Sequence, residues 1–261
     1  MKYTRLLTAG ALTASLVSSA VMAADASTPP MPDAQKKEIE KVIHDYLVSN
    51  PEVLLEASQA LQQKQQQNMQ QQAQSAIQEN AAQLFQGKLT TAGNPKGAVT
   101  VVEFFDYQCI HCKKMSPTIA NLLKKDNNLR VIYKEFPIFG KSSEMASRAA
   151  LAAGMQGKYQ AMHDALFKIE KRMDNKIVMD TAKSLGLDIS KLKTDMNSKE
   201  VTAILDANRQ LAEKLHLMGT PAFIIASTPD GQLKEGSEPS FIPGAASEES
   251  LQELIKKAAG K

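Results

Sequence analysis

The feature that most constrains the fold is a pair of cysteines set between an expected strand and an expected helix. The chain has 261 residues and two cysteines, Cys109 and Cys112. They follow the apolar run of residues 98–105 (AVTVVEFF), which is typical of a buried central strand. They also open the helical pattern of residues 109–125, and residues 129–136 (LRVIYKEF) predict a second strand. A Cys-x-x-Cys in this β-α-β context is typical of redox-active thiols.

The two cysteines have three other conceivable uses. A bridge that closes only two intervening residues constrains the unfolded chain little, so a structural disulfide is disfavoured. A closed zinc site needs four ligands, and the sequence has no second Cys or His pair at useful spacing. Cys109, His111 and Cys112 would suit a soft ion such as Cu(I), and this alternative stays open. The third alternative is a structural surface protein in which the two thiols have no function. We expect a redox-active Cys109–Cys112 disulfide, with no metal and no other cofactor.

The position of each cysteine predicts its role. Cys109 lies where free backbone N–H groups and the positive end of a helix converge, which favours a thiolate. We therefore expect Cys109 to be the exposed attacking thiol with a low pKa, and Cys112, one turn inside, to be the buried resolving thiol. His111 lies between them, and a protonated imidazole there would stabilise the thiolate; the alternative is an ordinary surface histidine. The other histidines are interpreted as ordinary helix residues: His44, His163 and His216.

Glu103 is the one charged residue in an apolar strand. Alternation along the strand puts it on the same face as Val101 and Phe105, beneath the helix that carries Cys112. A buried carboxylate is costly unless it is paired or functional, so we expect a proton acceptor or relay for Cys112. The alternative is a glutamate on an edge strand that reaches solvent.

The rest of the C-terminal part completes an α/β pattern. Residues 142–217 are helical in pattern, residues 222–226 (AFIIA) predict a strand, and residues 247–259 predict a terminal helix. Thr220-Pro221 precedes the late strand, and since only about 5% of X-Pro bonds in folded proteins are cis, the base rate predicts trans. We expect one sheet interrupted by a helical insertion, with the core in residues 98–141 and 218–259.

The N-terminus predicts export. Lys2 and Arg5 precede an apolar run over residues 6–21, and Val21-Met22-Ala23 offers small residues for cleavage, so residues 1–23 are expected to be a signal peptide. The run has 16 residues, which is short for a membrane anchor of about 20. The 31 basic against 28 acidic residues give no reason to expect nucleic acid as a partner.

Residues 24–86 are expected to form a helical region with a Gln-rich helix. Its apolar residues lie mainly between positions 39 and 61, far from any core in sequence, so they need something to pack on. A second copy of the segment would serve, and we expect a homodimer or larger assembly. Turn-forming residues over 87–97 mark the boundary to a domain over residues 90–259.

Taken together, these features resemble a known family. The Cys-x-x-Cys after a buried strand, the acid six residues before it, the helical insertion and the late Thr-Pro are similar to the thioredoxin-fold disulfide oxidoreductases of the bacterial periplasm. The DsbA-like group is the most similar, over about residues 90–259. The segment over residues 43–56 (IHDYLVSNPEVLLE) resembles the oligomerisation region of ScsC-like and surface-antigen members.

The resemblance implies a thioredoxin fold and a periplasmic oxidase or isomerase with a Cys-Ile-His-Cys site. It implies that Pro221 is cis beside the sulfurs, and that Thr220 binds substrate peptide through its backbone. Ile110, a further substrate-contacting position, stands where the best-known oxidases have Pro, whereas Thr220 is typical of the isomerases DsbC and DsbG. The implied partners are exported proteins and a membrane redox protein of DsbB or DsbD type. The implied location is the periplasm, with association with the outer membrane or cell surface left open.

Overall fold

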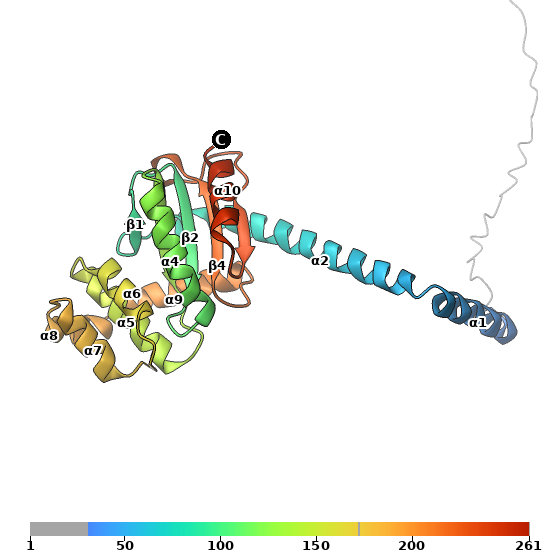
Figure 1. Cartoon of the computed structure of the whole chain (residues 1–261), viewed down its shortest axis with the longest axis horizontal. Coiled ribbons are helices and arrows are strands. Elements are labelled where there is room, and N and C mark those ends of the chain that lie inside the picture. Colours follow the sequence, from blue (N-terminus) through green and yellow to red (C-terminus); the bar gives the residue numbers. More distant parts are fainter. Residues whose placement is uncertain (1–30, 172, 261) are drawn as a thin grey trace, which may run out of the picture. The chain divides into compact units, whose positions relative to one another are not determined.

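The computed structural model describes residues 31–171 and 173–260, so the predicted signal peptide over residues 1–23 lies outside the described residues. In chain order the elements are α1 (Asp33–Ser49), α2 (Glu52–Glu79), α3 (Ala81–Leu84), β1 (Thr91–Gly93), β2 (Val99–Phe105), α4 (Ile110–Lys125), β3 (Leu129–Glu135), α5 (Lys141–Met155), α6 (Tyr159–Phe167), α7 (Asn175–Ser184), α8 (Ile189–Met196), α9 (Lys199–Lys214), β4 (Ala222–Ser227), β5 (Ser240–Pro243) and α10 (Glu248–Ala258) (Figure 1). No helix within the described residues is long and apolar enough to cross a membrane.

The strands form one sheet in the order β1-β3-β2-β4-β5. β2 pairs parallel to β3 and antiparallel to β4, so it is the central strand, and its seven residues are all buried. Helices α5 to α9 lie between β3 and β4 in the sequence, as the predicted insertion requires. The predicted α/β thioredoxin-like fold with a helical insertion is therefore confirmed.

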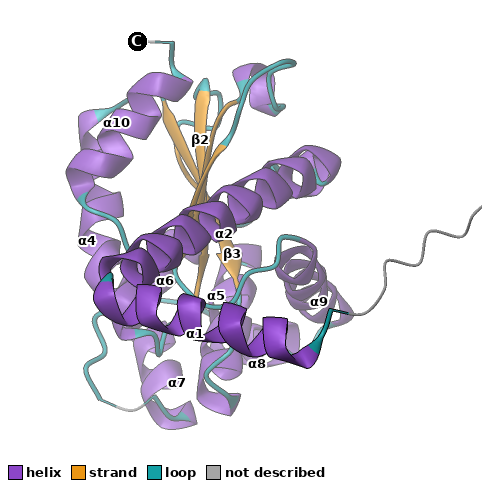
Figure 2. Ribbon diagram, turned by 90° about the vertical axis from the view of Figure 1, so that its right-hand side faces the viewer, coloured by secondary structure: helices purple, strands orange, loops and turns teal. Residues whose placement is uncertain are grey.

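Two hydrophobic clusters cover the two faces of this sheet. On one face, Val101 and Phe105 of β2 pack with Cys112 and Met115 of α4 and with α10. On the other face, alternate β2 residues pack with the end of α9. Figure 2 shows the strands between α4 and α10 on one side and α9 on the other.

The end of the Gln-rich helix also belongs to this second cluster. Ile77 of α2, Leu84 of α3 and Phe85 are almost wholly buried against the sheet. The chain divides into two compact units between Gln59 and Ala60, inside α2, so the second unit includes the rest of this helix. The physical reason is that the thin apolar stripe near Ile77 finds its partner in the sheet of its own domain.

Within the described residues, the first compact unit contains α1 and the start of α2. Its helix α1 has no buried residue, and its large apolar side chains are between 46% and 66% exposed: Ile39, Val42, Ile43, Tyr46 and Val48. An amphipathic helix of this kind has an unpartnered apolar face in the single chain.

Candidate active site

The two cysteines lie at the start of α4, as predicted. Cys109 is the residue before the first helical position, and its backbone N–H donates to the Asp106 carbonyl at 3.1 Å. Cys112 lies one turn inside the helix and is fully buried. Both residues are thiols in this structure. The disulfide between them stays a prediction.

The expectation that Cys109 is exposed is wrong, because only 3% of the residue is accessible. Its Sγ donates to the backbone carbonyl oxygen of Thr220 at 3.2 Å, so the segment before β4 covers it. The Thr220–Pro221 bond is cis, and the base-rate expectation of trans is therefore wrong. The resemblance to the oxidoreductases implied this cis bond beside the sulfurs.

The other two residues of the motif face outward. Ile110 is 63% exposed and His111 is also exposed, on the first turn of α4. Thus Ile110 is accessible to a substrate. The role of His111 in stabilising a Cys109 thiolate stays a prediction.

Glu103 lies in the centre of the sheet and not on an edge. It is 2% exposed, which excludes the solvent-reaching alternative. Burial raises the pKa of its carboxyl group to about 8, and the nearby Glu135 charge adds to the shift. Burial also raises the pKa of the Cys112 thiol far above its usual range, and Glu103 contributes to that rise. The two groups therefore interact, as a proton relay would require.

A second buried acid, Glu135, was missed by the sequence reasoning. It is fully buried at the end of β3, in register with Phe105. The hydroxyl groups of Tyr107 and Tyr159 donate to its Oε1 at 3.0 and 2.7 Å. Burial raises the pKa of Glu135 to about 8. The signal was weaker than for Glu103, because the same strand also carries Arg130 and Lys134 and one more charged residue did not stand out.

His163 lies on α6, as predicted, whereas the placement of His216 on a helix is wrong. His163 is 2% exposed, and its ring lies 4.1 Å from that of Tyr133 between centroids. Burial lowers the pKa of its imidazole to about 3, so His163 is neutral at physiological pH. His216 lies after the end of α9, with a φ of 53°. It is not helical.

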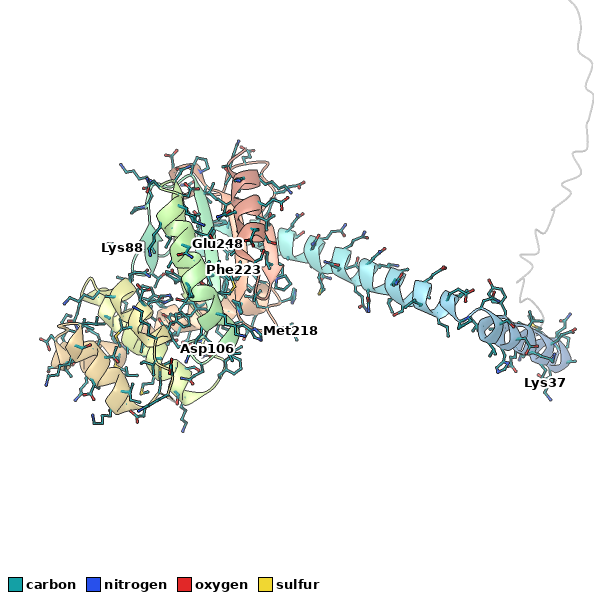
Figure 3. The ribbon with its side chains drawn as sticks, in the orientation of Figure 1. Lys37, Lys88, Asp106, Met218, Phe223 and Glu248 are labelled. Carbon is teal, nitrogen blue, oxygen red and sulfur yellow. The ribbon has the colours of Figure 1, made fainter. Side chains whose placement is uncertain are left out.

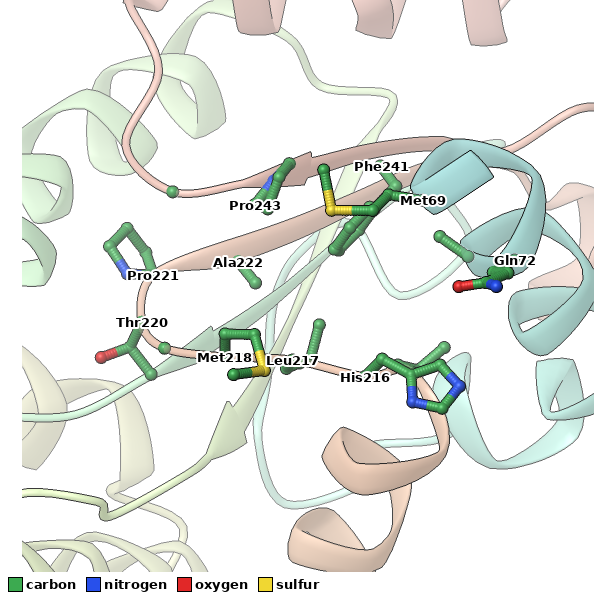
Figure 4. Close-up of a pocket in the computed structure, with 14 residues that line it drawn as sticks. Met69, Gln72, His216, Leu217, Met218, Thr220, Pro221, Ala222, Phe241 and Pro243 are labelled. Atoms are coloured by element: carbon green, nitrogen blue, oxygen red, sulfur yellow. The ribbon is translucent and has the colours of Figure 1, made fainter. Parts of the chain in front are cut away.

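A mainly apolar cavity of about 590 Å³ lies beside the cis-proline (Figure 4). It is walled by the loop before β4, by β5 and by the part of α2 that packs on the domain. The lining residues include Met69, Ala73, His216, Met218, Pro221 and Phe241. Thr220 and Pro221 line it as well as flank Cys109, so a chain bound at Cys109 would have this cavity within reach.

No group of three or more His, Cys, Asp or Glu side chains in the described part of the chain is placed to hold a metal ion.

Comparisons with known proteins identify the family of the chain. Residues 100–256 match the DSBA-like thioredoxin domain, and residues 35–68 match the copper resistance protein ScsC N-terminal domain. The crystal structure of BcfH from Salmonella enterica Typhimurium is 30% identical with a TM-score of 0.74, and the match covers 86% of this chain and 96% of that one. Proteus mirabilis ScsC in a transitional conformation is 29% identical with a TM-score of 0.62, covering 88% and 99%.

Similar curated proteins include the thiol:disulfide interchange protein DsbA of Burkholderia cepacia. It is 26% identical, over 64% of this chain and 79% of its own length. By contrast, the chain spans only 21% of the length of the first curated relatives, two Na(+)/H(+) antiporters of Salinispora species.

Proposed function

The chain belongs to the family of DsbA-like thiol–disulfide oxidoreductases, and from this premise we propose that it forms and isomerises disulfide bonds in exported proteins through Cys109 and Cys112. The observation that carries the proposal is the contact between Cys109 Sγ and the Thr220 carbonyl oxygen at the N-terminus of α4, with Cys112 buried behind it. The N-terminal sequence supports export to the periplasm.

In the oxidising direction, a substrate thiolate attacks Cys109 Sγ of the disulfide. A mixed disulfide forms, and Cys112 leaves with the electron pair of the broken S–S bond. Because burial disfavours the Cys112 thiolate, the departing sulfur takes a proton, and protonated Glu103 is the donor beneath it. A second substrate thiolate then attacks the substrate sulfur of the mixed disulfide and releases Cys109. Two electrons have passed from the substrate to the protein.

In the isomerising direction, the Cys109 thiolate attacks a wrong substrate disulfide. The released substrate thiolate then attacks another substrate disulfide, and the thiolate freed in that step attacks the substrate sulfur of the mixed disulfide. This releases the Cys109 thiolate, and the number of disulfides is unchanged. The oxidising cycle needs an electron acceptor, and a membrane redox protein of DsbB type would serve. A partner of DsbD type would keep the cysteines reduced for isomerisation.

The proposal is tested by separating the two cysteines. With a disulfide-bridged two-cysteine peptide, the Cys112→Ser protein should accumulate a mixed disulfide visible by mass spectrometry, because the Cys109 thiolate opens the peptide disulfide and no Cys112 thiol resolves the product. Oxidation is assayed separately, with the reduced peptide and protein in which any Cys109–Cys112 disulfide has been formed beforehand. The Cys109→Ser protein should form no mixed disulfide and should oxidise no peptide. If Cys109→Ser oxidises the peptide at the wild-type rate, the proposal is wrong.

We further propose that the first compact unit joins copies of the chain, as a homodimer or larger assembly. Support comes from the exposed apolar face of α1 and from the match to the ScsC N-terminal domain. Removal of residues 24–59 should give a monomer that still oxidises dithiols but no longer corrects a wrongly bridged protein. Removal of residues 24–86 is the wrong test, since it would take Ile77, Leu84 and Phe85 out of the core. Full isomerase activity in a proven monomer would contradict this proposal.

Binding of a soft metal is the second candidate function, because the N-terminal match is to a domain described as a copper resistance protein. Cu(I) bound by Cys109 and Cys112 would protect both thiols from a thiol-reactive mass tag, and metal analysis would find the ion with the protein. Full labelling in the presence of Cu(I) would exclude this function.

A further inference from the structure

Asp106 is a wholly buried carboxylate between β2 and α4, three residues before Cys109 (Figure 3). Its Oδ1 accepts a hydrogen bond from the backbone N–H of Gln108 at 2.6 Å. Its Oδ2 accepts from the backbone N–H groups of Ile138 and Phe139 at 2.7 and 3.0 Å. Buried carboxylates are stable only when such donors replace water. Asp106 is thus fixed by backbone groups.

These hydrogen bonds join two segments that lie about thirty positions apart in the sequence. One is the turn of residues 106–109, where the Asp106 carbonyl accepts from the N–H of Cys109. The other is the segment that follows β3, with Ile138 and Phe139. The two segments also share a surface cavity, lined by Gln108 and Phe139 among others. The Asp106 carboxylate therefore connects the Cys109 turn to the surface segment of Ile138 and Phe139.

The segment of Ile138 and Phe139 presents apolar side chains to solvent. Ile138 is 41% and Phe139 is 55% exposed, although their backbone N–H groups are held by a buried acid. Ile110, on the other side of Cys109 in sequence, is exposed as well. Fixed apolar side chains beside a reactive sulfur suit a ligand that is extended and partly apolar.

We propose that Asp106 is a positioning residue that holds Ile138 and Phe139 against the Cys109 turn, so that an unfolded polypeptide meets the sulfur and this apolar segment together. The inference rests on the proposed thiol–disulfide exchange and adds a determinant of substrate class. A small dithiol contacts only the sulfur, so its reaction does not depend on the hydrogen bonds from Asp106 to Ile138 and Phe139. A cysteine peptide with apolar neighbours needs both.

The test is Asp106→Ser in the full-length chain. The serine Oγ still accepts from the N–H of residue 108 as in an ST turn, but it is too short to reach Ile138 and Phe139. For a cysteine peptide with apolar flanking residues, kcat/KM should fall about fivefold, mainly through KM, as expected for the loss of one or two interface side chains. The rate of reduction by dithiothreitol should change less than the peptide reaction.

Asp126→Ser is the matched control. Asp126 follows the other end of α4, and its Oδ1 accepts from the N–H of Asn128 at 2.8 Å in the same kind of turn, at an exposed position. It should leave both reactions unchanged. A second variant, Ile138→Ser with Phe139→Ser, keeps the backbone donors but removes the apolar side chains. It should reproduce the rise in KM, and it decides the question if Asp106→Ser does not fold.

Several outcomes would overturn the inference. Equal losses with peptide and dithiothreitol in Asp106→Ser would mean that Asp106 supports only the turn. An unchanged peptide KM in either variant would mean that the segment does not contact substrate. A wild-type protein that exchanges with neither the peptide nor dithiothreitol would instead refute the proposed function, and the two failures are thereby distinguished.

Discussion

Replacement of the buried acid beneath Cys112 should change how stability depends on pH. Burial raises the pKa of Glu103 from its ordinary value of 4.5 to about 8. Between these values the folded protein holds a proton that the unfolded chain releases. Stability therefore falls as the pH rises from about 4.5 to about 8, and the loss is complete above the folded pKa. For a single group with these two pKa values, proton linkage lowers the free energy of unfolding by about 3.5 kcal/mol between pH 5 and pH 8.

Glu103→Gln removes this contribution, because the amide does not titrate. We expect the wild-type free energy of unfolding to fall with pH over this range more steeply than that of the variant, with a difference on the order of 3 kcal/mol. Both proteins also lose stability with rising pH through Glu135, whose pKa is likewise raised to about 8. The slopes therefore differ, but neither is zero.

The assay is urea unfolding of the reduced protein at pH 5, 6.5 and 8, with the m-value monitored to verify two-state behaviour. Glu253→Gln on α10 is the control, because that side chain is exposed and the same change there should leave the pH dependence as in the wild type. A Glu103→Gln protein with the wild-type slope would show that Glu103 is ionised in the fold at neutral pH. The proton relay to Cys112 would then be refuted.

Three further predictions follow from the packing and the hydrogen bonds. Tyr159→Phe removes a hydroxyl that donates to Glu135 at 2.7 Å, and should destabilise the protein by about 1 to 3 kcal/mol in urea unfolding; an unchanged midpoint would mean that the acid does not need this donor. Ile77→Ala leaves a cavity at a fully buried position on the sheet and should lower the free energy of unfolding by about 2 to 4 kcal/mol. An unchanged free energy of unfolding would show that the end of α2 does not pack on the sheet. Ile43→Ala, at an exposed position of α1, should change the free energy of unfolding of the domain by no more than about 0.5 kcal/mol. It should nevertheless weaken association of the chains in sedimentation velocity. Undiminished association would argue against an interface at Ile43.

The residues that the sequence identified correctly are those whose surroundings are local. Cys112 lies one turn into a helix that follows a strand, and Glu103 lies on a strand that faces that helix. Both placements follow from the periodicity of neighbouring residues. The fold class followed from the same patterns, since the β-α-β order around the cysteines fixes a parallel pair.

The features that the sequence did not show depend on distant segments. Cys109 is covered by Thr220, which is 111 positions away, so its exposure could not be inferred from the motif. Glu135 acquires its tyrosine donors from the Cys109 turn and from α6, and the buried position of His163 depends on the same insertion. The stripe around Ile77 was too thin to indicate which surface it packs on.

The asymmetry between the two sulfurs comes from the fold and not from the Cys-x-x-Cys spacing alone. Cys109 lies at the N-terminus of α4 and donates to the Thr220 carbonyl oxygen. Cys112 is fully buried above a carboxyl group, and both conditions disfavour its thiolate. In the proposed exchange, Cys109 stays bonded to the substrate in the mixed disulfide when the active-site disulfide opens, and Cys112 gains a proton as it leaves. A buried acid with a pKa of about 8 is largely protonated at neutral pH and can supply that proton. Because the same acid would take the proton back for the disulfide to form again, we propose that Glu103 serves both directions of exchange. Under the proposed function, we expect the redox partner and the assembly of the chains to set the balance between oxidation and isomerisation.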